Sequence, residues 1–268
     1  MNPKYFAALL LVLVAFAGRA ADEGGKTGAP LILLKLDDLA HASDPKIAVS
    51  PRFQRTVDFL AEEKIKSNFG IICETFETDC PAFIAWVKER HDSGMIEFWN
   101  HGYGFKFPNP NPAVKLAEYL GRSAEDQAAS LKKGQELVKA KTGIEMRAFG
   151  PHAAAIDDNL FVALKSRPEI ALVFFYGPAK AMSTDRVVLQ RRAELELPIF
   201  KPNFANMREH WEKYKTYDYL ALQGHPNSWD DQGFENFKQI VKFLREQGCR
   251  FVTISEYLAT LPAHKPEK

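Results

Sequence analysis

Polar side chains that could carry acid–base and metal chemistry follow four apolar segments of this sequence. Two adjacent carboxylates, Asp37 and Asp38, end the first segment, and His101, His152 and His225 follow three later ones. Carboxylates act as general bases or as metal ligands, and imidazoles act as ligands or as general acids. If these segments end at one edge of a sheet, one carboxylate could serve as a base and the other as a metal ligand. Aspartates are also common in turns, so Asp37 and Asp38 taken alone are better explained as a loop cap.

The elements that must position these residues are short β-rich runs that alternate with helical patterns. This alternation is typical of parallel strands joined by crossover helices, and several runs are almost wholly apolar, as strands covered on both faces must be. The predicted strands are Pro30–Leu36, Ser67–Cys73, Met95–Asn100, Glu145–Gly150, Ile170–Tyr176, Leu195–Phe200, Asp218–Gln223 and Arg250–Ile254. Seven to eight strands in one chain predict a single α/β domain, a (β/α) barrel with its chemistry at the carboxyl ends of the strands.

Capping residues predict where the longer helices begin and end. Ser50 precedes a first-turn proline and predicts a helix over 51–63, and Ser123 begins a capping-box pattern before a helix over 124–141. Aromatic and aliphatic residues at helical spacing precede Gly248, which supplies the stop of a third helix. That stripe is predicted to be core.

Composition and the N-terminus bound the class of protein. The chain is 46% hydrophobic and 26% charged, and its 35 basic residues balance 34 acidic ones without a basic cluster, which argues against a nucleic-acid partner. Lys4 precedes a 12-residue apolar run, Phe6–Ala17, that small residues follow. This pattern predicts a signal peptide over residues 1–20, a single domain over 21–268, a secreted or periplasmic location and no stable membrane span after cleavage. An uncleaved membrane anchor is the alternative.

Three cysteines remain after this cleavage: Cys73, Cys80 and Cys249. They allow at most one intrachain disulfide, and geometry must decide whether Cys73 and Cys80 pair. The sequence has no Cys-x-x-Cys motif, so a structural zinc knuckle is not supported.

The motifs, taken in chain order, resemble those of the polysaccharide deacetylase family, the relatives of chitin and peptidoglycan deacetylases. The resemblance extends over nearly the whole mature chain. The matching segments are Asp37-Asp38, His101-Gly102-Tyr103, Arg147-x-Phe149-x-Pro151 and Gly224-His225-Pro226. The resemblance implies a distorted (β/α) barrel and a divalent metal, commonly zinc, with cobalt or nickel as alternatives. It also implies hydrolysis of N- or O-acetyl groups on a polysaccharide or oligosaccharide.

The resemblance also implies a role for each matching residue. Asp37 would be the base that deprotonates water, and Asp38 and His101 would bind the metal. Arg147 would hold the Asp37 carboxylate in a charge-assisted pair and lower its pKa. His225 would protonate the leaving amine or alcohol.

One position departs from the family pattern. The second histidine ligand is expected four residues after His101, where this chain has Phe105, and a phenyl ring cannot bind zinc. Catalytic zinc usually keeps three protein ligands, and Asp38 with His101 supplies two. His152 is expected to be the third ligand, although a buried histidine is more often hydrogen-bonded structure. The weaker candidates are Asn100 and His41.

Substrate contacts are predicted near the same face. Backbone N–H groups near Pro151 could stabilise the oxyanion, and Tyr103 and Trp229 could stack on sugar rings, although core packing is the default role of an aromatic residue. A second hypothesis is a catalytically silent barrel that binds carbohydrate or acts as a scaffold. Phe105 favours that hypothesis, whereas retention of the base, its arginine and the acid favours the enzyme.

Overall fold

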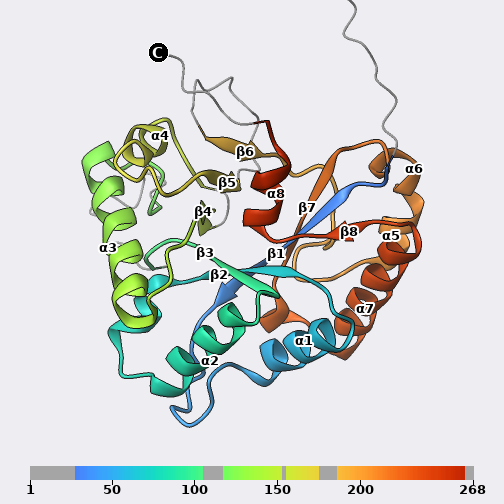
Figure 1. The fold of residues 1–268 in the computed structure, drawn as a ribbon, viewed down its shortest axis with the longest axis horizontal. Coiled ribbons are helices and arrows are strands. Elements are labelled where there is room, and N and C mark those ends of the chain that lie inside the picture. The colour runs from blue at the N-terminus through green and yellow to red at the C-terminus, as the bar shows by residue number, and fades with distance from the viewer. Residues whose placement is uncertain (1–27, 105–116, 153–154, 175–185, 263–268) are drawn as a thin grey trace, which may run out of the picture.

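The computed structural model describes residues 28–104, 117–152, 155–174 and 186–262, and these form one curled parallel sheet with helices around it (Figure 1). The predicted signal peptide and Phe105 lie outside the described residues. The strands are β1 (Leu31–Leu39), β2 (Ser67–Ile71), β3 (Ile96–Asn100), β4 (Ala148–Phe149), β5 (Leu172–Phe174), β6 (Val187–Leu189), β7 (Tyr219–Gly224) and β8 (Arg250–Phe251). Their order is β6-β5-β4-β3-β2-β1-β7, with β8 beside β1. The α/β barrel prediction is confirmed, in the form of an open half-barrel.

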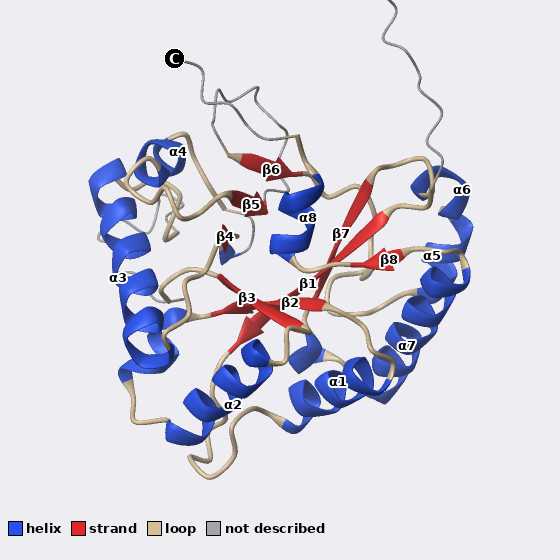
Figure 2. Cartoon of the chain, in the orientation of Figure 1, coloured by secondary structure: helices blue, strands red, loops and turns tan. Residues whose placement is uncertain are grey.

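Helices cover the outer face of this sheet, and one short helix lies inside its curve (Figure 2). They are α1 (Pro51–Glu62), α2 (Pro81–Asp92), α3 (Ala124–Thr142), α4 (Asn159–Leu164), α5 (Phe204–Glu209), α6 (Trp211–Tyr214), α7 (Asp231–Glu246) and α8 (Ile254–Thr260), with short 3-10 turns η1 (Cys73–Glu77) and η3 (Pro226–Ser228). The predicted caps are confirmed: Ser50 Oγ accepts from Phe53 N at 3.3 Å, and Ser123 Oγ accepts from Asp126 N at 3.1 Å. Gly248 has φ 78° after α7.

The alternation of side chains along β1 explains how charged residues reach the inside of the barrel. Ile32, Leu34 and Leu36 pack into the main core under the outer helices, whereas Leu33 packs into a second core with residues of α8. Successive side chains of a strand point to opposite faces, so Lys35 and Asp37 share the concave face with Leu33. Both charged side chains are 1% exposed.

The predicted strand Leu195–Phe200 is wrong, and β6 takes its place in the sheet. The segment folds back on itself instead: Leu197 N donates to Lys201 O at 3.0 Å, and Glu196 forms an isolated antiparallel bridge with Pro202. Pro198 has no N–H to give to a sheet ladder, which is the physical reason that an apolar run here does not form an interior strand.

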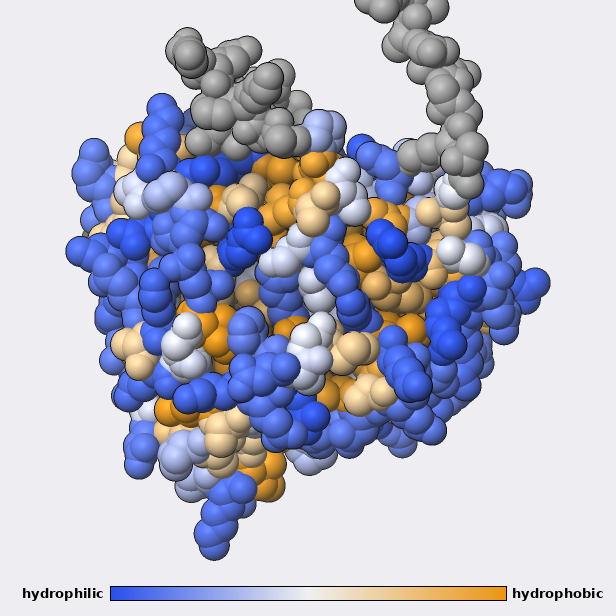
Figure 3. Space-filling view, viewed as in Figure 1, coloured by the Kyte–Doolittle hydropathy of each residue, from blue (hydrophilic) through white to orange (hydrophobic). Residues whose placement is uncertain are grey.

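On the face of the molecule that Figure 3 shows, polar and apolar residues are unevenly distributed. In the space-filling view, hydrophilic residues dominate along α3 and α7, and apolar residues appear between the elements nearer the centre (Figure 3). Within the described residues, no helix is long and apolar enough to cross a membrane.

Cys73, Cys80 and Cys249 are all buried free thiols, so the Cys73–Cys80 disulfide that the sequence leaves open does not form.

Candidate functional site

The carboxyl ends of four strands bring the predicted reactive residues together. Asp37 and Asp38 lie near the end of β1, His101 directly follows β3, and His225 directly follows β7. His152 lies three residues after β4. Parallel pairing aligns these ends at one edge of the sheet, as the register of Leu36 with Gly224 in β7 illustrates.

Three of these residues form a cluster of potential metal ligands. One ligand atom from each of Asp38, His101 and His152 lies within 4.8 Å of the other two. Asp38 Oδ1 is 3.2 Å from His101 Nε2, and the two imidazole rings are 4.5 Å apart between centroids. The Nδ1–H of His101 donates to Gly150 O at 2.6 Å, which fixes the ring and leaves Nε2 facing Asp38. Sequence reasoning named the same three residues.

The protonation state of His152 suits ligand binding. Burial, followed by the charge of His101, lowers the pKa of His152 to about 2, so its imidazole is neutral at ordinary pH. A metal ligand must be the neutral imidazole with a lone pair. Asp38 has φ 64°, a left-handed conformation that is uncommon outside glycine and is often found at functional sites.

The partner of Asp37 is Lys35. Lys35 Nζ donates to both carboxylate oxygens of Asp37, at 2.7 and 2.6 Å, and Gln223 Nε2 donates to Oδ2 at 2.8 Å. Burial works to raise the pKa of Asp37, but the charge of Lys35, supported by His101 and His225, outweighs it and holds that pKa below its usual value. Asp37 is therefore a buried carboxylate that stays ionised.

The predicted pairing of Arg147 with Asp37 is wrong. Arg147 is exposed, and its Nη1 lies 3.4 Å from Ser255 Oγ at the start of α8. The residue precedes the first residue of β4, so it lies at the amino end of that strand, whereas Asp37 lies near the carboxyl end of β1. Lys35, two residues before Asp37 on the same face of the same strand, provides the positive charge instead.

Glu196 is a site residue that sequence reasoning missed. Its carboxylate is 1% exposed and accepts from His225 Nδ1 at 2.7 Å, from His225 N at 2.7 Å and from Trp229 Nε1 at 2.6 Å. Burial works to lower the pKa of His225, but the hydrogen bond to Glu196 and the charges of Asp37, Glu196 and Asp38 raise it. The signal was a lone glutamate inside the apolar run Leu195–Phe200, which the strand prediction obscured.

The two aromatic residues predicted to contact sugars, Trp229 and Tyr103, differ in burial. Trp229 is fully buried, bonds to Glu196 and packs 4.7 Å from the Phe237 ring, so the prediction that it stacks on a sugar is wrong. Its large apolar ring fills the core under α7 instead. Tyr103 is partly exposed, and its hydroxyl lies 2.6 Å from both Glu77 Oε1 and Lys133 Nζ.

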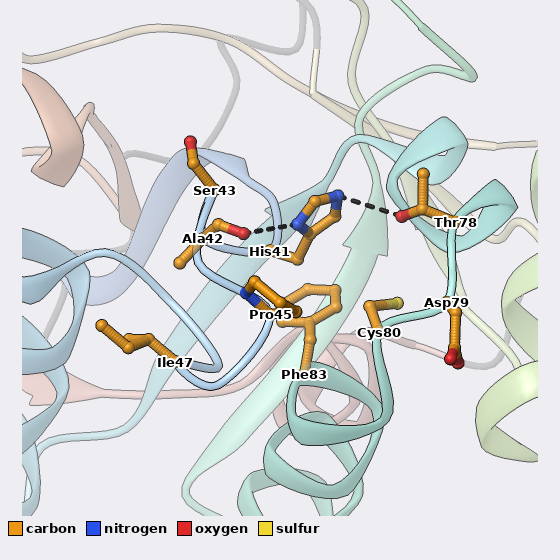
Figure 4. A pocket seen from close by; sticks show the side chains of 9 residues that line it. All are labelled: His41, Ala42, Ser43, Pro45, Ile47, Thr78, Asp79, Cys80 and Phe83. Carbon is orange, nitrogen blue, oxygen red and sulfur yellow. Dashed lines mark hydrogen bonds between the residues drawn. The ribbon is translucent and has the colours of Figure 1, made fainter.

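The remaining predicted residues lie around the ligand cluster. Pro151 is buried directly before His152. Asn100 is buried, and its Oδ1 accepts from Gly102 N at 2.8 Å. His41 lies in a separate small pocket, where Nδ1 donates to Ala42 O at 2.6 Å and Nε2 is 3.1 Å from Thr78 Oγ1 (Figure 4). Neither weaker ligand candidate belongs to the cluster.

The loop after β3 is held by a buried carboxylate. Glu118 is 3% exposed, accepts from Tyr103 N at 2.9 and 3.0 Å, and has its pKa raised to about 7 by burial. Gly102 has φ 91°, and a Cβ there would overlap Glu118 Oε2 and lie 2.8 Å from His152 Nε2. Only glycine combines this backbone conformation with this close approach.

We expect Gly102→Ala to lower the free energy of unfolding by about 3 kcal/mol, because it adds overlap with Glu118 and His152 to the cost of a left-handed alanine. Gly143→Ala is the matched control, since Gly143 has φ 81° but a Cβ added there would have no neighbouring atom within 4 Å. It should cost about 1 kcal/mol. Urea unfolding measures both, and equal losses would contradict the crowding described here.

Comparisons with solved structures match the fold of this chain to the fold of CE4 family proteins. A cobalt complex of a family 4 acetyl xylan esterase from Clostridium thermocellum has a TM-score of 0.58 and 16% identity, over 87% of this chain and 93% of the esterase. Peptidoglycan deacetylase PdaC from Bacillus subtilis has a TM-score of 0.54 and 15% identity, over 86% and 91%. No protein-family model and no curated protein matches the sequence.

A CE4 family pseudoenzyme from Bacillus anthracis is also similar, with a TM-score of 0.57 and 15% identity. The match covers 86% of this chain but 66% of the pseudoenzyme, so the chain spans about two thirds of that protein's length. Identities this low show the fold. The chain has the fold of the CE4 deacetylases, and the resemblance indicated by its sequence motifs is confirmed at that level.

Proposed function

We propose that this protein is a secreted or periplasmic metal-dependent hydrolase that removes N- or O-acetyl groups from a carbohydrate. The observation that carries the proposal is the position of the Asp38, His101 and His152 cluster beside a separate carboxylate and a separate imidazole. Asp37 Oδ2 is 3.6 Å from His101 Nε2 and 3.8 Å from His225 Nε2. The esterase and deacetylase with the same fold support a carbohydrate substrate.

The ligand cluster fits a divalent ion. Asp38, His101 and His152 would hold it, and one carboxylate with two imidazoles is a donor set that suits zinc, with cobalt or nickel as alternatives. The hydrogen bond from His101 Nδ1 to Gly150 O orients the imidazole, as such bonds commonly do for histidine ligands of metals. When bound, such an ion polarises the acetyl carbonyl and lowers the pKa of water.

The chain's own residues supply the proton transfers. The ionised carboxylate of Asp37 accepts a proton from the attacking water, while Lys35 and Gln223 fix its orientation. The imidazolium of His225, held by Glu196, donates a proton to the leaving nitrogen or oxygen of the sugar. The products are acetate and a free amine or hydroxyl group. Backbone N–H groups near Pro151 and the side chain of Tyr103 are proposed to face the substrate.

A catalytically silent barrel that binds carbohydrate is the second candidate. The specific observations in its favour are Phe105 in place of a histidine ligand and the similarity to a CE4 pseudoenzyme. Its fold would be the same, but no acetate would be released.

The test is the metal content of the purified mature protein together with acetate release from acetylated oligosaccharides. We expect about one ion per chain and acetate release, and we expect Asp38→Ala, His101→Ala and His152→Ala each to weaken zinc binding by about 100-fold. His41→Ala is the matched control, because His41 lies outside the cluster, and it should bind zinc as the parent does. No bound ion after incubation with zinc, cobalt or nickel, with no acetate release, would favour the silent barrel.

A further inference from the structure

An exposed apolar turn lies beside the candidate acid. Among the described residues, five large hydrophobic side chains are exposed, and three of them belong to one turn: Leu197 at 48%, Ile199 at 51% and Phe200 at 44%. We call residues 197–201 the apolar turn. Exposed apolar side chains gathered in this way often mark a ligand or partner site, whereas single ones do not.

The apolar turn is braced by hydrogen bonds within it and by one from Asn203. Leu197 N donates to Lys201 O at 3.0 Å, and Lys201 N donates to Pro198 O at 3.1 Å. Asn203 Nδ2 also donates to Leu197 O at 2.9 Å. A surface fixed before binding loses less conformational entropy when a ligand arrives.

Phe200 joins the apolar turn directly to the site. Its ring centroid is 4.7 Å from that of His225, in an edge-on arrangement of 75°, and its N–H donates to Glu196 Oε2 at 2.8 Å. The same carboxylate therefore orients the acid and fixes Phe200. Phe200 also has φ 70°, which is costly for a bulky residue and persists where surrounding contacts impose it.

We propose that Phe200 is a substrate-binding residue whose ring packs on the apolar face of a pyranose ring next to the scissile acetyl group. This inference rests on the proposed function. In that reaction the atom protonated by His225 belongs to the sugar, so the sugar must lie within reach of His225 Nε2. The half-exposed ring of Phe200 is the aromatic surface beside it, and aromatic rings with a few polar groups are typical of ligand sites. Phe200 thus takes the role that the sequence predicted for Trp229.

The first experiment measures binding and needs no turnover. Tetra-N-acetyl-chitotetraose and acetylated xylotetraose are titrated into the mature protein and its variants by calorimetry. We expect at least one of them to bind the parent protein and Phe200→Ala to weaken that binding about tenfold, while Phe200→Tyr restores it. Val162→Ala is the matched control, because Val162 is 54% exposed on α4 and lies outside the site; it should bind as the parent does.

Equal binding by Phe200→Ala and the parent would overturn the proposal, and so would a parent that binds neither oligosaccharide at millimolar concentration. The second experiment compares kcat/KM for the bound oligosaccharide with kcat/KM for 4-nitrophenyl acetate, which has no sugar ring. Phe200→Ala should lower the ratio of the two values about tenfold, mainly through KM, and an unchanged ratio would count against the proposal. If the parent binds oligosaccharide but releases no acetate, the proposed hydrolase activity is contradicted. The Phe200 proposal is then tested by binding alone, and it still requires Phe200→Ala to weaken that binding.

Discussion

Replacing Lys35 with methionine should lower the free energy of unfolding by about 3–5 kcal/mol at pH 7, because it leaves the Asp37 carboxylate buried without its positive partner. Both side chains are 1% exposed, and Lys35 Nζ contacts both carboxylate oxygens of Asp37. The pKa of Asp37, now held low by Lys35, should rise in the variant. The loss should therefore shrink at pH 4, where the unpaired carboxyl group takes up a proton. Urea unfolding at the two pH values measures it.

Two further variants isolate the cause of this loss. Lys66→Met makes the same substitution in a partly exposed ion pair with Glu256, and it should cost less than about 1 kcal/mol. The double variant Lys35→Met with Asp37→Asn should recover much of the loss, because no unpaired charge remains. A single Lys35→Met variant as stable as the parent at pH 7 would contradict the pairing that replaces the predicted Arg147 contact.

Replacing Glu196 with glutamine should lower kcat for acetate release by about 10³-fold, because an acid held in the wrong orientation or tautomer loses most of its catalytic effect. Glu196 accepts from His225 Nδ1, and its charge is among the causes that raise the pKa of His225. In the variant, His225 should therefore lose its proton at a lower pH than in the parent. The alkaline limb of the plot of kcat against pH should shift to lower pH. Glu145→Gln is the matched control, because Glu145 pairs with Lys139 on the surface.

The hydrogen bond between Glu196 and His225 also makes stability depend on pH. A histidine whose pKa is raised by folding stabilises the protein fully below its unfolded pKa of about 6.5, and this contribution is lost as pH rises through the folded value. The difference in unfolding free energy between the parent and Glu196→Gln should therefore be larger at pH 5.5 than at pH 9. A difference that grows with pH would contradict the raised pKa of His225.

The ligand cluster was accessible from sequence because it depends on chain order and strand ends. Parallel strands carry their carboxyl ends to one edge, so residues that follow separate strands meet there whatever their distance in sequence. Asp38, His101 and His152 follow this rule, and the structure brings their ligand atoms within 4.8 Å. Whether they bind a metal is the proposal that the metal measurement tests.

The sequence by itself determined the alternation of strands and helices, the caps at Ser50 and Ser123, and the strand-end positions of the aspartates and histidines, because these depend on local pattern and order. Only the tertiary structure decided which charges pair. Lys35 and not Arg147 reaches Asp37, and Glu196 reaches His225 from a segment about 30 residues away. Such pairings depend on which face a side chain takes and on how far a strand extends. The face of a side chain and the length of a strand are not fixed by residue type, because burial and packing across the whole sheet set them together.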